Sequence, residues 1–327
     1  MPEPKFEYKD IIGVSKQKDP KRIPAGYVRY AMNVDSDNDK KLHRRRGRTL
    51  LDDENTHSMW SNATICLCVQ AGDLKEATLN LNTMTFTYTT ILGNVGDTEM
   101  IFQEVADMVF FSNGEKFGYI RDRVAHGIPE VDQEFKDRMA GGHLMEYWDS
   151  RLWVFQDNLL HYSDATEPWV RDKRHNFVSF NSKGRMLRAV KDGLYVSDCA
   201  RCGFLHGGSG DPPKFNYTEV CNFPAIEGMA ISSAEQVSGI SMKVALWATE
   251  DGFYRGLPGG QVNRVTGDHF LVNGAARGRV MVLPRTFKNQ VKVRQFLGTY
   301  DLHPGYGGAE MALEIPAIEI SGRITTA

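Results

Sequence analysis

The feature that most constrains this chain is a phrase that recurs along it: a short apolar strand, a tight turn containing Asn, Asp or Gly, and a second apolar or aromatic strand. Turn residues that tolerate positive φ, placed between β-branched and aromatic runs, predict β-hairpins. Five such turns are marked by Gly72, Gly114, Asn158, Gly193 and Gly252. Their spacings of 42, 44, 35 and 59 residues bracket the roughly 40 to 45 residues of a four-stranded propeller blade. The pattern therefore predicts an all-β propeller.

Features between the markers refine this prediction. The longest spacing contains a Gly- and Pro-rich stretch between Asp198 and Tyr217, which we expect to be a surface-loop insertion and not a strand. Residues 256–260 are interrupted by Pro and lack a Lys, so they predict a turn between blades and not a phosphate loop. Trp153 and Trp247 occupy the same position in their repeats, which predicts shared packing in the core.

The chain is expected to have three segments: an N-terminal arm over residues 1–56 that contains a β-hairpin, a propeller over 57–300, and a C-terminal extension over 301–327. The ring of blades in a propeller closes when a strand from one terminus of the chain completes the blade that the other terminus forms. This closure removes an exposed sheet edge. The arm strand over residues 27–34 is a candidate for this closure. We therefore predict six blades, five counted by their markers and a sixth from the C-terminal strands and the arm, with five blades as the alternative.

The bulk composition excludes some partners. Lys and Arg number 39 and Asp and Glu 41, so no global field draws the chain to nucleic acid or to a membrane surface. The first residues lack the apolar run of a signal peptide, and nowhere do about eighteen apolar residues follow one another, so we expect no membrane insertion and a cytoplasm-like environment. The five cysteines are then expected to be reduced thiols.

A weak metal-like cluster contains Cys199, Cys202, His206 and Cys221. Thiolate and imidazole ligands of this kind can hold zinc in a tetrahedral site. A single Cys-x-x-Cys pair without a second paired spacing is weak evidence, and unpaired thiols are the favoured interpretation. We expect neither a metal nor another cofactor.

The arm is expected to form a strand, a polar turn rich in Asp and Asn, and a return strand studded with arginines. Asp35, Asp37 and Asp39 have the spacing of a calcium loop, but Lys40 and Arg46 stand where such a loop has Gly and Glu. A solvated hairpin turn is therefore favoured over a calcium site.

The return strand carries the basic residues Arg44, Arg45, Arg46 and Arg48. Clustered basic side chains are typical of nucleic-acid binding. Acidic residues close by, including Asp35 and Asp37, can neutralise the run, so ion pairs between strands or between subunits are the favoured role. Contact with DNA passing through a channel is the alternative.

The arm also carries a family-specific phrase between residues 23 and 50. It resembles the opening of propeller-bearing virion proteins of tailed bacteriophages, including tail nozzle and tail-tube components of short-tailed phages. Their opening reads as a Pro-Gly turn, Asn-Val-Asp with further acidic residues, then Arg-Arg-Pro-Gly and a Thr. The matching residues here are Pro24, Gly26, Asn33, Val34, Asp35, Asp37, Arg44, Arg45, Gly47 and Thr49, whereas Arg46 replaces the Pro.

The resemblance implies a structural protein of the phage tail: a nozzle, tail-tube or head-to-tail connector ring that forms part of the DNA-ejection channel. It implies a homo-oligomeric ring, with six subunits expected, that binds other tail or connector proteins and contacts genomic DNA without sequence preference. The expected location is the virion tail, after assembly in the host cytoplasm.

Catalysis is not expected, because the chain contains no Gly-x-Ser-x-Gly elbow, no His-Glu-x-x-His and no Walker-type Gly-Lys-Ser/Thr. The alternative function, from a different class, is a propeller that binds or cleaves glycans at the phage tail or host surface. Trp148 and Trp169 are the surface aromatic candidates for it, since both are expected in connecting segments. A WD-type scaffold is disfavoured because no recurring Gly-His and Trp-Asp blade signature is present.

Overall fold

The computed structural model describes residues 54–80, 82–83, 85–210, 212–237 and 240–265. It also describes the backbone of seven strands outside these ranges: β1 (Gly13–Val14), β2 (Tyr27–Val28), β3 (Val34–Ser36), β4 (Leu42–Arg44), β27 (Arg277–Pro284), β28 (Asn289–Phe296) and β29 (Met311–Glu314). The chain divides into two compact units. One contains residues 48–187 and 208–215, and the other contains residues 188–207, 216–327 and 1–47.

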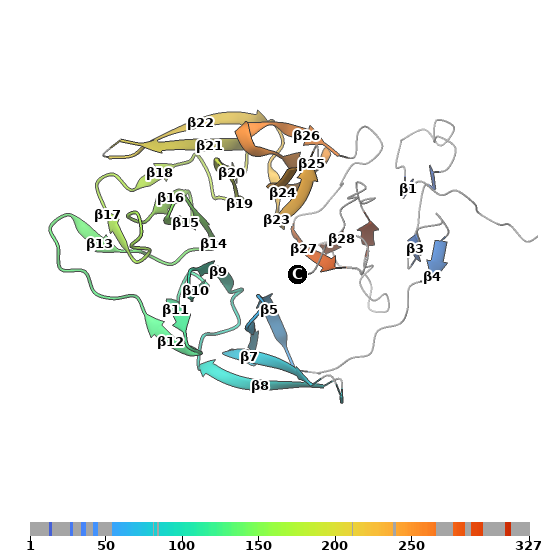
Figure 1. Ribbon diagram of the computed structural model, residues 1–327, viewed down its shortest axis with the longest axis horizontal. Helices are drawn as coiled ribbons and strands as arrows, with labels where there is room; N and C mark the ends of the chain where they lie inside the picture. Colours follow the sequence, from blue (N-terminus) through green and yellow to red (C-terminus); the bar gives the residue numbers. More distant parts are fainter. Residues whose placement is uncertain are drawn as a thin grey trace, which may run out of the picture. The chain divides into compact units, whose positions relative to one another are not determined.

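Four four-stranded sheets and a group of four strands within a fifth, larger sheet follow one another along the chain. In each of these five groups the strands lie side by side in chain order, as β9 to β12 do in Figure 1. Blade one contains β5 (Thr56–Ser61), β6 (Cys66–Gln70), β7 (Asp73–Asn80) and β8 (Thr85–Leu92). Blade two contains β9 (Ile101–Val105), β10 (Met108–Ser112), β11 (Phe117–Arg121) and β12 (Val124–Gly127). Blade three contains β14 (Leu144–Trp148), β15 (Arg151–Gln156), β16 (Leu159–Tyr162) and β18 (Phe177–Ser179).

Blade four contains β19 (Met186–Val190), β20 (Gly193–Ser197), β21 (Cys202–Ser209) and β22 (Lys214–Cys221). Blade five contains β23 (Ala225–Val237), β24 (Ile240–Thr249), β25 (Gly252–Gly256) and β26 (Val262–Arg264), with the short 3₁₀ turn η2 (Pro258–Gly260) between its last two strands. A separate pair joins β13 (Lys136–Arg138) to β17 (Val170–Asp172). These sheets are the blades of a β-propeller, so the predicted fold class is confirmed.

The propeller has five blades, the alternative count. The expected sixth blade is not a separate four-stranded sheet among the described strands. Instead β27, β28 and β29 continue the sheet of blade five, because β23 pairs in parallel with β27 at Glu227 and Arg277. The result is a seven-stranded sheet in the order β26-β25-β24-β23-β27-β28-β29.

Two strand pairs lie in the N-terminal segment. β1 pairs in parallel with β2, and β3 pairs antiparallel with β4 at the place of the expected arm hairpin, with Val34 opposite Arg44 and Asp35 opposite His43. Residues 29–33, within the strand expected to close the propeller, lie outside the described part of the chain. Closure by the arm therefore stays a prediction.

The uneven spacing of the turn markers has a topological cause. Gly72, Gly114, Asn158 and Gly252 lie at the turn between the second and third strands of their blades. Gly193 lies instead at the turn between the first and second strands of blade four, so the spacing before it is short and the spacing after it is long. The expected insertion was the wrong explanation of the long gap.

The Gly-rich stretch after Asp198 is not a surface loop. It forms the eight-residue strand β21, and β22 follows after a short turn. A Cβ atom at Gly203, inside β21, would overlap the ring of Tyr217, so glycine leaves room for that ring. Gly207 and Gly208, with φ of 111° and 99°, bend the end of the strand in a conformation that side chains disfavour. The Gly-rich composition predicted a loop. Composition alone does not show that an aromatic ring packs over one of these glycines and allows the segment to be a strand.

Large side chains of the second strands form the core of several blades. Phe110 of β10, Trp153 of β15, Tyr195 of β20 and Trp247 of β24 are each at most 1 % exposed. The predicted shared burial of Trp153 and Trp247 is confirmed. Burying a large apolar side chain contributes roughly 1.5 to 3 kcal/mol, so these second strands contribute strongly to the stability of blades two to five. Among the residues described, no helix is long and apolar enough to cross a membrane.

Candidate functional site

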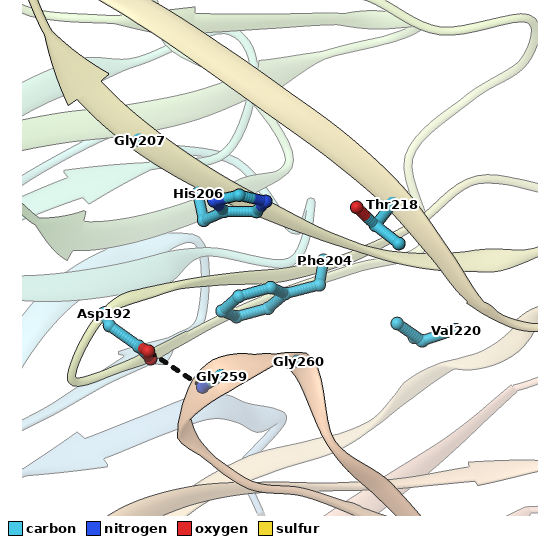
Figure 2. A pocket seen from close by; sticks show the side chains of 8 residues that line it. All are labelled: Asp192, Phe204, His206, Gly207, Thr218, Val220, Gly259 and Gly260. Atoms are coloured by element: carbon cyan, nitrogen blue, oxygen red, sulfur yellow. Dashed lines mark hydrogen bonds between the residues drawn. The ribbon is translucent and has the colours of Figure 1, made fainter.

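A pocket of about 410 Å³ opens beside blade four, and we call it the blade-four pocket. Phe204, His206 and Gly207 of β21 and Thr218 and Val220 of β22 line one part of it. Asp192, in the turn before β20, and Gly259 and Gly260 of η2 line the rest. Figure 2 shows the His206 and Phe204 rings one above the other, with Asp192 and Gly259 on one side and Thr218 and Val220 on the other.

The aromatic part of the pocket follows from strand periodicity. Side chains two residues apart on a strand point to the same face, which places Phe204 and His206 together on β21. Their ring centroids are 5.6 Å apart and the rings are 19° from parallel. Phe204 is 4 % exposed, whereas His206 is half-buried, so the imidazole is the ring more accessible to a ligand.

Two glycines hold the Phe204 ring in place. A Cβ atom at Gly260 would lie 2.8 Å from Phe204 Cδ1, and one at Gly193 would overlap the same ring. The Tyr195 ring also packs against the Phe204 ring, with the two ring centroids 5.0 Å apart. The Phe204 ring therefore has little room to move, and it gives His206 a rigid support.

The η2 turn is fixed to blade four by hydrogen bonds. Asp192 Oδ2 accepts a bond from the backbone N–H of Gly259 at 2.8 Å, which Figure 2 marks with a dashed line. The Tyr195 hydroxyl lies 2.6 Å from the carbonyl oxygen of Leu257 and 2.9 Å from that of Gln261, and its proton can be donated to either. Burial, reinforced by the charge of Asp192, raises the pKa of Tyr195, so the hydroxyl stays a donor.

The pocket corrects one prediction and reveals residues that sequence reasoning missed. Residues 256–260 do not connect two blades; they connect β25 to β26 inside blade five and form a wall of the pocket. Asp192 and Phe204 were not expected to take part in a site. The Asp-Gly signal at Asp192 was interpreted only as a turn, and Phe204 lay in the stretch expected to be a loop.

The four weak metal candidates do not form one cluster; only Cys202 and Cys221 come together. Among the described residues, no group of three or more His, Cys, Asp or Glu side chains is placed to hold a metal ion. Cys199 is exposed, Cys202 and Cys221 are buried, and His206 belongs to the blade-four pocket. The Cys202 thiol lies 3.2 Å from the carbonyl oxygen of Phe223 and can donate to it.

Cys202 and Cys221 form a buried thiol pair next to Tyr254. Hydrogen bonding to Cys202 is the main cause that lowers the pKa of Cys221. The same Cys221 contact, together with burial, raises the pKa of Cys202. The Tyr254 hydroxyl donates its proton to Asp251 Oδ2 at 2.5 Å. All five cysteines lie in the described part of the chain, and none of them forms a disulfide bond.

The prediction that Trp148 lies in a connecting segment at the surface is wrong. Trp148 is the last residue of β14 and is 9 % exposed. Its ring packs between Trp153 at 5.8 Å and Phe215 at 6.1 Å, and its carbonyl accepts a bond from Trp153 Nε1 at 3.1 Å. Trp169 is partly buried and packs against a core cluster that includes Phe110. Neither tryptophan forms an exposed platform for a glycan.

The arm residues proposed for contacts between subunits or with DNA are Asp35, Asp37, Arg44, Arg45, Arg46 and Arg48. Their side chains lie outside the part of the chain whose side chains the structure describes. Asp35 and Arg44 belong to the backbone strands β3 and β4. Their role in contacts therefore stays a prediction.

The fold and the pocket define a β-propeller protein with a concave site between blade four and the η2 turn of blade five. No family model matches the chain, and no curated protein matches it. Among solved structures it is similar to the extracellular domain of BT4673 from B. thetaiotaomicron, with 10% identity and a TM-score of 0.48. That likeness covers 77% of this chain and 33% of the BT4673 chain.

Two further solved structures are similar. Hsv2 of Kluyveromyces lactis has 12% identity and a TM-score of 0.42, covering 76% of each chain. PorZ of Porphyromonas gingivalis has 10% identity and a TM-score of 0.41, covering 83% of this chain and 39% of PorZ. Sequence identities and TM-scores this low do not indicate a function, so the function is argued from the chain itself.

Proposed function

We propose that this chain is a structural component of a bacteriophage tail: a nozzle, tail-tube or connector ring that forms part of the DNA-ejection channel. In this proposal it assembles in the host cytoplasm into a homo-oligomeric ring of six subunits and resides in the virion tail. It binds other tail or connector proteins, contacts genomic DNA without sequence preference, and acts mechanically, not as an enzyme.

The observation that carries the proposal is the extension of blade five. Three strands outside the blade repeat, β27 to β29, add to its sheet and end in β29, which is the last strand of that sheet as described. A terminal strand offers backbone N–H and C=O groups to a further strand. A strand from a neighbouring subunit's arm, added there, would join one propeller to the next.

The arm supplies the second support. Residues 23–50 resemble the opening of tail propeller proteins, and β3 and β4 form an antiparallel pair inside that segment. A head-to-tail contact between one subunit's arm and the next subunit's extension is heterologous, and such contacts generate closed rings when the rotation between subunits closes.

The mass of the purified full chain by native mass spectrometry tests the proposal. We expect a closed ring, either for the protein alone or after mixing with purified virion tail components. A strict monomer that binds none of those components would overturn the proposal.

A charge-reversal variant tests the contribution of the arm. Replacing Arg44 and Arg45 with Glu is expected to remove the ring, because these residues are proposed to form ion pairs across the subunit interface. The matched control replaces Arg121 and Arg138, two partly exposed arginines whose ion pairs lie within one subunit, with Glu. The control is expected to keep the ring mass. Equal ring formation by both variants would exclude the arm arginines from the interface.

A further inference from the structure

We infer that the blade-four pocket binds a neutral saccharide unit of a glycan. This inference is independent of the tail proposal, because it depends on side chains of blade four and the η2 turn, and not on subunit assembly. It also differs from the glycan site expected at Trp148 and Trp169, which the structure places against the core.

The charge of the lining argues against anionic ligands. Asp192 carries a carboxylate, and neither Lys nor Arg lines the pocket. Phosphate, sulfate and carboxylate ligands are bound in proteins by Arg, Lys or helix N-termini, and a carboxylate without a cation beside it repels them. A neutral ligand with several hydroxyl groups avoids this penalty.

The chemistry of the lining matches the two kinds of surface on a sugar ring. A pyranose has an apolar face of C–H groups and an edge of hydroxyl groups. The half-buried imidazole of His206, supported by Phe204, offers a flat ring to the apolar face, and Val220 adds apolar surface beside it. Asp192 and Thr218 lie on opposite sides of the rings and can accept from or donate to hydroxyl groups.

Asp192 keeps capacity for a ligand although it already holds the η2 turn. It accepts one bond, from Gly259 N–H at 2.8 Å. A carboxylate has about four lone-pair sites on two oxygens, so it can also accept from neighbouring hydroxyls. Bonds from hydroxyl groups to a charged acceptor are among the stronger hydrogen bonds of neutral ligands.

Size and rigidity suit a small ligand. The volume of about 410 Å³ lies within the roughly 300 to 1,000 Å³ of small-molecule sites. The Phe204 ring is confined by Gly193 and Gly260, and η2 is tied to Asp192, so the lining is formed before a ligand arrives. A preformed site loses less conformational entropy on binding.

A glycan array containing neutral and anionic glycans, probed with the full-length chain, tests the inference, and isothermal titration with the best neutral glycan measures its affinity. We expect binding to neutral glycans. The variants His206→Ala and Asp192→Ala are each expected to weaken it by about tenfold or more, the effect of losing a ring contact or a bond to a charged group.

Two matched controls separate loss of the site from loss of folding. His126→Ala removes a histidine of β12 that stacks on Tyr119 at 5.1 Å, as His206 stacks on Phe204, but does not line this pocket. Asp107→Ala removes an exposed turn carboxylate that bonds Arg121. Both are expected to bind like the unmodified protein, and thermal unfolding of all four variants shows which are folded. Thr218→Ala, at an exposed position, serves as a third pocket variant if one of the first two fails to fold.

Three results would overturn the inference: binding to no neutral glycan, binding only to anionic glycans, or neutral-glycan binding that folded pocket variants leave unchanged. Ring formation, measured separately by native mass, is unaffected by any of these outcomes. If the protein forms a ring but binds no glycan, the tail proposal stands and the glycan inference is wrong. If the protein is a monomer that binds neutral glycans, the glycan inference is supported and the tail proposal is not.

Discussion

The stability of blade three is expected to depend on pH through His161. This residue of β16 is 6 % exposed, and its Nδ1 lies 2.5 Å from Nη1 of Arg171. Arginine is a donor only, so Nδ1 must accept, and the imidazole is neutral with its proton on Nε2. Burial, and then the positive charge of Arg171, lowers the pKa of His161 to about 4.

The sign and size of the effect follow from this pKa. The ordinary value is 6.5, so between pH 6.5 and about 4 the unfolded chain binds a proton that the folded protein does not. The free energy of unfolding must therefore fall as the pH is lowered through this window. The gap between the two pKa values corresponds to roughly 3 kcal/mol, fully lost only below about pH 4.

Urea unfolding followed by tryptophan fluorescence, between pH 7 and pH 4, measures this effect. In His161→Asn the side-chain oxygen can still accept from Arg171, but the side chain does not titrate. The wild type is expected to lose about 3 kcal/mol more than this variant across the range, since the contributions of the carboxylates cancel in the difference. His126→Asn, at an exposed position of β12, shows whether removing any histidine changes the profile. Equal pH dependence of wild type and His161→Asn would refute the reasoning.

Three further predictions concern packing and the thiol pair. Trp247→Ala, which empties a site only 1 % exposed, is expected to cost about 3 to 5 kcal/mol in chemical unfolding, and an unchanged midpoint would contradict its role in the core. Gly203→Ala places a Cβ atom on a packed ring and is expected to cost about 1 to 3 kcal/mol, whereas Gly127→Ala, which meets open space, is expected to be close to neutral; equal effects would contradict the packing described. Cys202→Ala removes the hydrogen bond that contributes most to lowering the pKa of Cys221, so the pH profile of Cys221 alkylation, read by peptide mass, is expected to move to higher pH; an unmoved profile would argue against that bond.

The candidate site could be predicted only in part. The chain has a recognisable Asp-Gly turn at Asp192 and Gly193, and the turn is present. That Asp192 would accept a bond from Gly259, 67 residues away, could not be read from either segment, because the contact forms only when two blades are folded. The role of Phe204 could not be predicted for a related reason. The glycines near it are typical of loops, and only the folded structure shows that aromatic rings fill the space beside these glycines.

The sequence by itself determined the fold class and the burial of the repeated tryptophans, since turn chemistry and strand alternation are local properties that each hairpin expresses independently. Only the tertiary structure decided which hairpins share a sheet. It made 202–209 and 214–221 two strands of blade four, joined β27, β28 and β29 to blade five, and buried Trp148 beside Phe215 from a distant strand. These outcomes depend on packing between segments far apart in the chain, and a pattern read within a few residues carries no information about such contacts.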